Sequence, residues 1–483
     1  MNIKDKIIGG VVVGVALVAV LPIGCSSDVP ACTVTCTADA DCPGDQTCST
    51  LGRCSDSGTC PCAAGAFLGC ADGTTAQFCN STGDGPELAN CGGFACNATQ
   101  ERCDLCVPES VSCGDGGGTV ERCDATGLPL ASEACGVLGC VPGEEARCGR
   151  IVPVGLPEVC DTPAQVASVD LSGLLVTSMD DACTGGVVTQ TGGPAVCVVR
   201  AGSIRVGDVK VTGARAIALV ADGPLRVEGT LDASADVAAS GPGGGTIVSG
   251  AVVSGARGGG GAGGRHTGAS GGSTVAGGGG GGGAAIDPIV LGSIVGGARP
   301  SNGIMNMAPV SGGGGGGAVV LVSCRDTVTV SGLVDVGGGG GGGGRDRTAG
   351  AVVDFVAGGG GGAGGYLVLE GARVNVTGRL YANGGGGGGG CNVDDGVAPN
   401  GADGPRAQTG GPGSLGVGSG VGTGGTGGSA ATPTVGGGST DSAGGGGGAA
   451  GRFQIYVPSG VSPTLAPIEV SPAFEPHLAV PTR

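Results

Sequence analysis

Cysteine is the residue type whose number and spacing in this chain could do chemistry. The chain carries 24 cysteines in 483 residues, and most of them lie before residue 161. Cysteines in such numbers indicate disulfides in an oxidising compartment, or else thiolate metal sites. The metal interpretation is the weaker one, because His266 and His477 lie far from the cysteine-rich part and Cys103–Cys106 is a lone CxxC. We therefore predict disulfides, with no metal site and no cofactor.

Two stretches of six cysteines repeat nearly the same spacing. The gaps between cysteines are 7, 8, 11, 4 and 6 residues in the first stretch and 6, 9, 11, 4 and 7 in the second. Each copy is too short to fold on an apolar core alone, so we predict three disulfides within each copy and none between copies. The disulfide candidates are these twelve cysteines and one later pair: Cys62, Cys70, Cys79, Cys91, Cys96, Cys103, Cys106, Cys113, Cys123, Cys135, Cys140, Cys148, Cys183 and Cys197.

A third set of six cysteines precedes these copies: Cys32, Cys36, Cys42, Cys48, Cys54 and Cys60. Within it, Asp39 and Asp41 could ligate calcium, but two carboxylates without further ligands make a poor site. Asp394, Asp395 and Asp403 offer carboxylates in a later loop, where a solvated loop is the better interpretation because the calcium-binding nonapeptide is absent. The sequence contains no Ser/His/Asp or Cys/His constellation, and we predict no catalytic residue.

The first 25 residues have the layout of a secretory signal peptide. Lys4 and Lys6 precede an apolar run over residues 7–21, which is short for a membrane-spanning helix. The run ends in Leu-Pro-Ile-Gly-Cys, which resembles the bacterial lipobox, with Pro22 where leucine is usual. The resemblance implies that Cys25 is diacylated and anchors the chain to a membrane, and Ser26 implies sorting to the outer membrane. The alternative is ordinary signal cleavage nearby, with Cys25 in a disulfide.

The composition of the rest limits both the fold and the partners. Only 2% of the residues are aromatic, which argues against one large compact core, and thin cores of Val, Ile and Leu fit better. The formal net charge is −17, which repels phosphate backbones and argues against nucleic-acid binding.

Three similar segments in the second half predict stacked β-strands. They begin at Ala216, Ala318 and Tyr366, and each has an apolar strand, a turn, an alternating strand and a Val-x-Gly-x-(Leu/Val) element. Degenerate copies are predicted at 211–213 and 453–457. Alternation predicts Val328, Val330, Val334 and Val336 on one face, with Thr327, Thr329 and Asp335 on the other. One copy cannot bury its apolar face alone, so we predict a mainly β domain, either a β-solenoid or, less regularly, a sandwich.

The 116 glycines are concentrated in long inserts that follow the third strand of each segment, at 241–317, 337–365 and 383–451. Two interpretations of these runs remain open. Free linkers are the default for such a composition. Paired runs of similar length could instead bond laterally as a bundle of extended, left-handed polyglycine helices, at a high cost in backbone entropy.

The predicted organisation follows from these patterns. It comprises a lipoprotein signal peptide (1–24), a cysteine-rich module (25–61), two six-cysteine repeats (62–105 and 106–150), first β rungs (151–240), glycine-rich loops with interleaved rungs (241–451), and a last strand with a Pro-rich tail (452–483). This arrangement resembles predicted myxobacterial-type cysteine-rich and glycine-rich surface lipoproteins, a largely uncharacterised group.

The expected function is a structural or adhesive, non-catalytic role at the cell surface. The partners would be a membrane, reached through the lipid anchor, and surface polysaccharides or proteins. Two alternatives stay open. A carbohydrate-active lyase or hydrolase on a β-helix would need charged side chains clustered on one face. A protein-binding receptor or sensor subunit would act through the cysteine modules.

Overall fold

The protein is mainly β, with a disulfide-rich N-terminal part followed by a large sheet, as predicted. The structure, a computed structural model, describes residues 34–50, 52–58, 60, 62–83, 85–237, 239–245, 257–275, 277–285, 293–300, 312–349, 352–392, 396–429 and 432–483. The chain divides into two compact units, Met1–Ser110 with Arg122–Leu130, and Val111–Glu121 with Ala131–Arg483. No helix among the described residues has the length and apolar character needed to cross a bilayer.

The cysteine-rich part consists of short antiparallel hairpins. Its elements are η1 (Asp39–Asp41), β1 (Thr47–Cys48), β2 (Cys54–Ser55), β3 (Phe67–Asp72), β4 (Thr75–Cys79), β5 (Pro86–Asn90), β6 (Cys96–Asn97), β7 (Arg102–Cys103), β8 (Val111–Cys113), β9 (Thr119–Arg122), β10 (Glu133–Ala134), η2 (Gly136–Leu138), β11 (Cys140–Val141) and β12 (Arg147–Cys148). In the first six-cysteine repeat β3, β4 and β5 form a three-stranded sheet, and in the second β8, β9 and β10 do.

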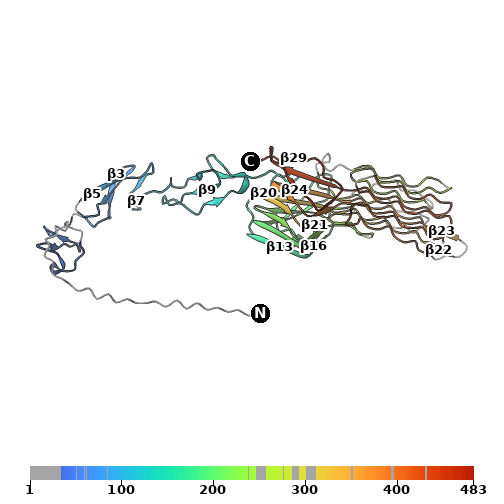
Figure 1. Cartoon of the computed structure of the whole chain (residues 1–483), viewed down its shortest axis with the longest axis horizontal. Helices are drawn as coiled ribbons and strands as arrows, with labels where there is room; N and C mark the ends of the chain where they lie inside the picture. Colours follow the sequence, from blue (N-terminus) through green and yellow to red (C-terminus); the bar gives the residue numbers. More distant parts are fainter. Residues whose placement is uncertain are drawn as a thin grey trace, which may run out of the picture. The chain divides into compact units, whose positions relative to one another are not determined.

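The large sheet in the second unit is built from parallel strands, except that Val187–Val188 pairs antiparallel with Val196–Ala201 (Figure 1). Its elements and those around it are β13 (Ser168–Val176), η3 (Asp180–Ala182), β14 (Val187–Val188), β15 (Val196–Ala201), β16 (Ser203–Thr212), β17 (Ala216–Ala221), β18 (Leu225–Val227), β19 (Thr230–Asp232), β20 (Ala318–Val330), β21 (Leu333–Asp335), β22 (Asp346–Ala349), β23 (Val352–Phe355), β24 (Tyr366–Val376), β25 (Arg379–Tyr381), β26 (Arg452–Val457), β27 (Thr464–Leu465), β28 (Glu469–Ser471) and β29 (Leu478–Ala479).

The strands form three parallel ladders, and each passage of the chain adds one strand to each ladder. The first ladder contains β15, β17, the start of β20, the start of β24, and β26. The second ladder contains the start of β16, β18, the ends of β20 and β24, and β27. The third ladder contains the end of β16, β19, β21, β25 and β28. We call one such passage a rung.

The register stacks like residues on one another between rungs. In the second ladder Val206, Val227, Val330, Val376 and Leu465 are successive partners. In the third ladder the successive partners are Val209, Leu231, Val334, Leu380 and Val470. The Val-x-Gly-x-(Leu/Val) elements are thus in register.

The rungs enclose a thin aliphatic core. Val328, Val330, Val334 and Val336 are all fully buried in it, on the face that alternation predicts. The first ladder is buried on its other face as well, where Ala218, Val320 and Val368 pack against Ile151 and Leu156 from the segment that precedes the rungs. This explains why its strands are continuous apolar runs, since a parallel sheet covered on both faces favours them.

The glycine of each Val-x-Gly element lies at a corner where backbones meet. A Cβ at Gly229, Gly332 or Gly378 would lie less than 3.0 Å from backbone atoms of the rung before it. This stack of corner glycines begins at Gly207: Val206 is the partner of Val227, and a Cβ at Gly229 would lie against the Gly207 backbone. The predicted degenerate copy at 211–213 was therefore wrong in register: Val211 is buried, but it belongs to the last part of β16 and pairs with Leu175. The pattern Val-x-Gly misled because the first rung has Val-Gly without the intervening residue.

The described parts of the three glycine-rich inserts pack side by side as an ordered bundle, beyond which lies the hairpin of β22 and β23 (Figure 1). Backbone hydrogen bonds between runs recur every three residues. The N–H groups of Gly338, Gly341 and Gly344 donate to Asn383, Gly386 and Gly389 at 2.8 Å each. A period of three residues is that of an extended helix with three residues per turn. Of the two interpretations of the runs, the described residues have the ordered one.

The bonds also run across the bundle, both between inserts and between the runs of one insert. Gly339 donates to Gly314, Gly362 to Gly339, Gly385 to Gly362, and Gly448 to Gly385, all at 2.8–2.9 Å. A Cβ at Gly338, Gly339, Gly340, Gly341 or Gly343 would lie less than 3.0 Å from a backbone oxygen of a neighbouring segment, which is the Asp236 carbonyl for Gly339. Close approach of backbones is therefore what requires glycine in this run.

One glycine run lies at the border of the bundle. Gly278 and Gly281 are exposed, and a Cβ at either would meet no atom within 4 Å. Between them, a Cβ at Gly279 would lie less than 3.0 Å from the oxygen atoms of Gly271 and Gly272. Positions that point outward and positions that point inward thus differ within one run.

Candidate functional site

The two six-cysteine repeats have the same disulfide connectivity. In order along each copy, the first cysteine pairs with the third, the second with the fifth and the fourth with the sixth. The pairs are Cys62–Cys79, Cys70–Cys96 and Cys91–Cys103 in the first copy, and Cys106–Cys123, Cys113–Cys140 and Cys135–Cys148 in the second. The later pair Cys183–Cys197 is also a disulfide, joining the residue after η3 to β15. These bonds indicate an exported protein.

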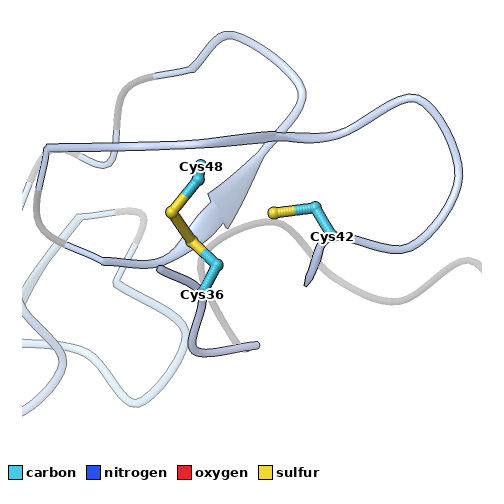
Figure 2. A group of neighbouring side chains, drawn as sticks. All are labelled: Cys36, Cys42 and Cys48. Atoms are coloured by element: carbon cyan, nitrogen blue, oxygen red, sulfur yellow. A yellow bond between two sulfur atoms is a disulfide. The ribbon is translucent and has the colours of Figure 1, made fainter. Parts of the chain in front are cut away.

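Three sulfur atoms near the start of the described chain lie close enough together to suggest a metal centre. The Sγ atoms of Cys36, Cys42 and Cys48 lie within 4.8 Å of one another (Figure 2). Cys36 is bonded to Cys48, however, and Cys42 to Cys54. Since metal binding requires thiolates, the cluster in this oxidised state is a pair of neighbouring disulfides.

The two carboxylates considered for calcium in this module accept hydrogen bonds from backbone N–H groups. Asp41 accepts hydrogen bonds from the N–H groups of Thr37 and Ala38 and from the Thr37 hydroxyl, at 2.8–3.0 Å. These bonds lower the pKa of Asp41. Asp39 accepts from the Cys48 N–H at 2.7 Å. Of the later candidates, Asp403 accepts from the Gly340 N–H at 2.8 Å, whereas Asp394 and Asp395 lie outside the described residues, as does the predicted lipid attachment residue Cys25.

A disulfide that spacing does not predict fastens the segment before the rungs to the first ladder. Cys160 pairs with Cys324 of β20 across 164 residues. The Ile151 N–H donates to the Cys324 carbonyl at 2.9 Å. We call residues 151–160 the strap. Its cysteine belongs to no repeat, so the only signal in the sequence was that Cys160, Cys324 and Cys391 lie outside the six-cysteine sets and the later pair.

Beneath the strap lies a buried acid, Glu370 of β24. Its side chain is fully buried and accepts a hydrogen bond from the Val154 N–H at 2.9 Å, while its Oε1 has no hydrogen-bond partner among the described residues. Burial raises the pKa of Glu370 to about 8. Sequence reasoning missed this residue, because a single glutamate at the end of an apolar run gives no sign that it is buried.

Charged side chains meet where the third ladder passes into the glycine-rich inserts. Asp232 and Asp335 are partners in the third ladder, and the Arg406 guanidinium bonds to both, at 3.0 and 2.7 Å. Lys210 also pairs with Asp232, at 3.0 Å. Burial raises the pKa of Asp335; burial acts in the same direction on Asp232, but hydrogen bonds from Ser234 and Lys210 outweigh it and lower that pKa. These contacts fasten the third insert to the rungs.

Two clefts open beside the rungs. One, of about 510 Å³, lies between the strap and residues 184–188 and has Arg200 in its wall. The Arg200 guanidinium already bonds to Asp222, to the Thr162 carbonyl and to the Cys324 sulfur, so its donors serve the protein itself. The other, of about 420 Å³, lies where β16 meets the first insert, and Lys210, Asp236 and Arg299 are among its lining residues.

Comparison of the chain with protein-family models, with curated proteins and with solved structures finds no match.

Proposed function

We propose that the chain is a lipid-anchored protein of the cell surface with a structural or adhesive, non-catalytic role. The observation that supports this most is the bundle of glycine runs. Its described interior is mostly backbone joined by regular hydrogen bonds, with isolated buried side chains such as those of Cys391 and Ser442, so it forms an ordered body. A large body held in this way is suited to presenting a contact surface.

In this proposal the anchor is Cys25 in the outer membrane, and the cysteine modules act as a stalk. Each six-cysteine repeat is stapled by three disulfides, which fix a short segment without a large core. The Cys25→Ser variant should move from the membrane to the soluble fraction. If that variant stays with the membrane and the wild type takes up no labelled fatty acid, the anchor is wrong.

The adhesive role is tested on intact cells. Cells that carry the wild-type chain should attach to polysaccharide- or protein-coated surfaces in greater number than cells that lack it. External protease should remove both the chain and the difference. Equal attachment with and without the chain, at matched surface levels, would contradict the adhesive role.

A further inference from the structure

The cleft of about 420 Å³ falls in the size range of ligand sites, about 300–1,000 Å³. Its walls come from the end of β16 and the following turn, from the segment after β19, and from the loop that carries Arg299. The side chains that line it are polar or small, with hydroxyl groups from Thr212, Ser234 and Ser240. Such walls suit a hydroxylated ligand better than an apolar one.

Arg299 is the cation in this cleft whose guanidinium is left over for a ligand. Within the described part of the chain, no hydrogen bond or ion pair involves that guanidinium. Arg200, at the other cleft, differs in this respect, since its donors are engaged.

The backbone makes room for the Arg299 side chain. Its aliphatic stem passes over Gly245, where a Cβ would lie 2.6 Å from both Cγ and Cδ of the arginine. Gly245 also has φ +69, a conformation that other residues rarely adopt. The stem is therefore held by packing, which leaves the charged group at the cleft.

The other charges in the cleft have mixed sign. Lys210 shares its amino group between Asp232, at 3.0 Å, and Ser234, at 3.4 Å, and its side chain is still 44% exposed. Asp236 also lines the cleft, where its Oδ1 accepts from the Ala239 N–H at 2.7 Å. A polymer dense in phosphate would meet repulsion from Asp236 and from the acidic chain as a whole. A ligand with one carboxylate among several hydroxyl groups fits both signs.

We propose that this cleft binds an acidic saccharide, in which a sugar carboxylate pairs with Arg299 and sugar hydroxyl groups bond to Asp236 and Thr212. Planar guanidinium groups bind carboxylates through two parallel hydrogen bonds. This inference rests on the proposed surface role and gives it a chemical class of partner.

The test is titration of the purified full chain with two uronate oligomers, one of galacturonate and one of mannuronate and guluronate. A maltooligosaccharide of equal length is the neutral arm, and acetate is the arm that carries a carboxylate without sugar hydroxyl groups. Binding of at least one uronate oligomer is expected, at least tenfold tighter than the neutral arm and weaker at high salt. Equal affinity for acidic and neutral oligomers, no binding of either uronate oligomer, or acetate binding as tight as that of the oligomers would overturn the proposal.

Variants locate the site. Arg299→Ala should weaken uronate binding at least tenfold, and Arg299→Lys should weaken it less, because the charge is kept without the planar fork. Arg226→Ala is the matched control, since Arg226 is an exposed arginine of β18 outside the cleft. Unchanged binding in a folded Arg299→Ala chain would refute the site. If cells fail to attach while the purified chain binds uronates through Arg299, the adhesive role is wrong and the proposed binding site is supported. If cells attach through the chain but the purified chain does not bind uronates, the proposed binding site alone is wrong.

Discussion

The side chain of Glu370 is held away from water, and one of its oxygen atoms has no hydrogen-bond partner in the part of the chain that the structure describes. The folded chain favours its protonated form, because its pKa is raised to about 8 from an unfolded value of about 4.3. A raised folded pKa contributes stability that is fully present below the unfolded pKa and is lost as pH rises through the folded one. The strap that covers Glu370 should therefore be most stable in mild acid.

The Glu370→Gln variant tests this sign. It should unfold at nearly the same temperature from pH 5 to pH 9, whereas the wild type should lose stability steadily as pH rises from about 5 to about 8. At pH 9 the variant should be the more stable by a few kcal/mol, since one pKa unit corresponds to about 1.4 kcal/mol. Glu228→Gln, at an exposed ion pair with Arg205, should keep the wild-type profile. Parallel profiles for the wild type and Glu370→Gln would disprove the effect.

At the scale of elements, the glycine runs permit a comparison within one residue type. Gly340→Ala places a Cβ against the Gly401 backbone, and an overfilled site of this kind typically costs about 1–3 kcal/mol. Gly281→Ala points into open space and should be neutral or stabilising by up to about 1 kcal/mol, because alanine restricts the unfolded chain. Melting temperatures of the two variants decide the matter. Equal values would mean that the bundle does not hold in solution.

The rungs permit a second comparison, between the two faces of β20. Val330 is fully buried, and Val330→Asp puts an unpaired charge into a thin core, which should cost several kcal/mol. Its neighbour Thr329 is half-buried on the opposite face and pairs with Arg226, so Thr329→Asp should cost less than about 1 kcal/mol. Denaturant midpoints would show the difference. A mild effect of Val330→Asp would argue against a closed core.

Local sequence patterns predicted the β-strands and the cysteine repeats, because the residues that form these patterns are close together in the sequence. The alternation in Val328 and Val330 identifies the buried face, and near-identical cysteine gaps identify a duplication. The phase of the first rung was not predictable, since Val206-Gly207 lacks the spacer of the later copies. The candidate cleft was also beyond prediction, because Lys210 and Arg299 come together only when an insert folds back on β16.

At the scale of the whole molecule, long-range tethers matter more than local ones. The Cys160–Cys324 disulfide closes a loop with a sequence separation of 164, whereas Cys183–Cys197 closes one of 14. Because loop-closure entropy grows with the logarithm of loop length, removal of the first bond should cost about 2 kcal/mol more than removal of the second. The Cys160→Ser/Cys324→Ser and Cys183→Ser/Cys197→Ser double variants, compared in denaturant, provide the measurement. A larger loss in the second variant would contradict this ranking.

Sequence reasoning did not predict the strap, because its contacts join residues that are far apart in the sequence. Cys160, Ile151 and Val154 reach β20 and β24 across many residues, and no periodic pattern joins them. Asp335 was expected on the polar face of its strand. It does lie opposite the valines, but Arg406 from a distant insert buries it there.

Because hydrogen bonds between runs recur every three residues, each glycine run has a fixed phase relative to its neighbours. A run without side chains carries no landmark along its length, so its alignment depends only on where it enters and leaves the bundle. An extra three glycines would return every amide to an equivalent direction, whereas one extra glycine would turn all later amides by a third of a turn. An insertion of three glycines in a run should therefore keep the hydrogen bonds to its neighbours in phase, whereas an insertion of one or two should put them out of phase.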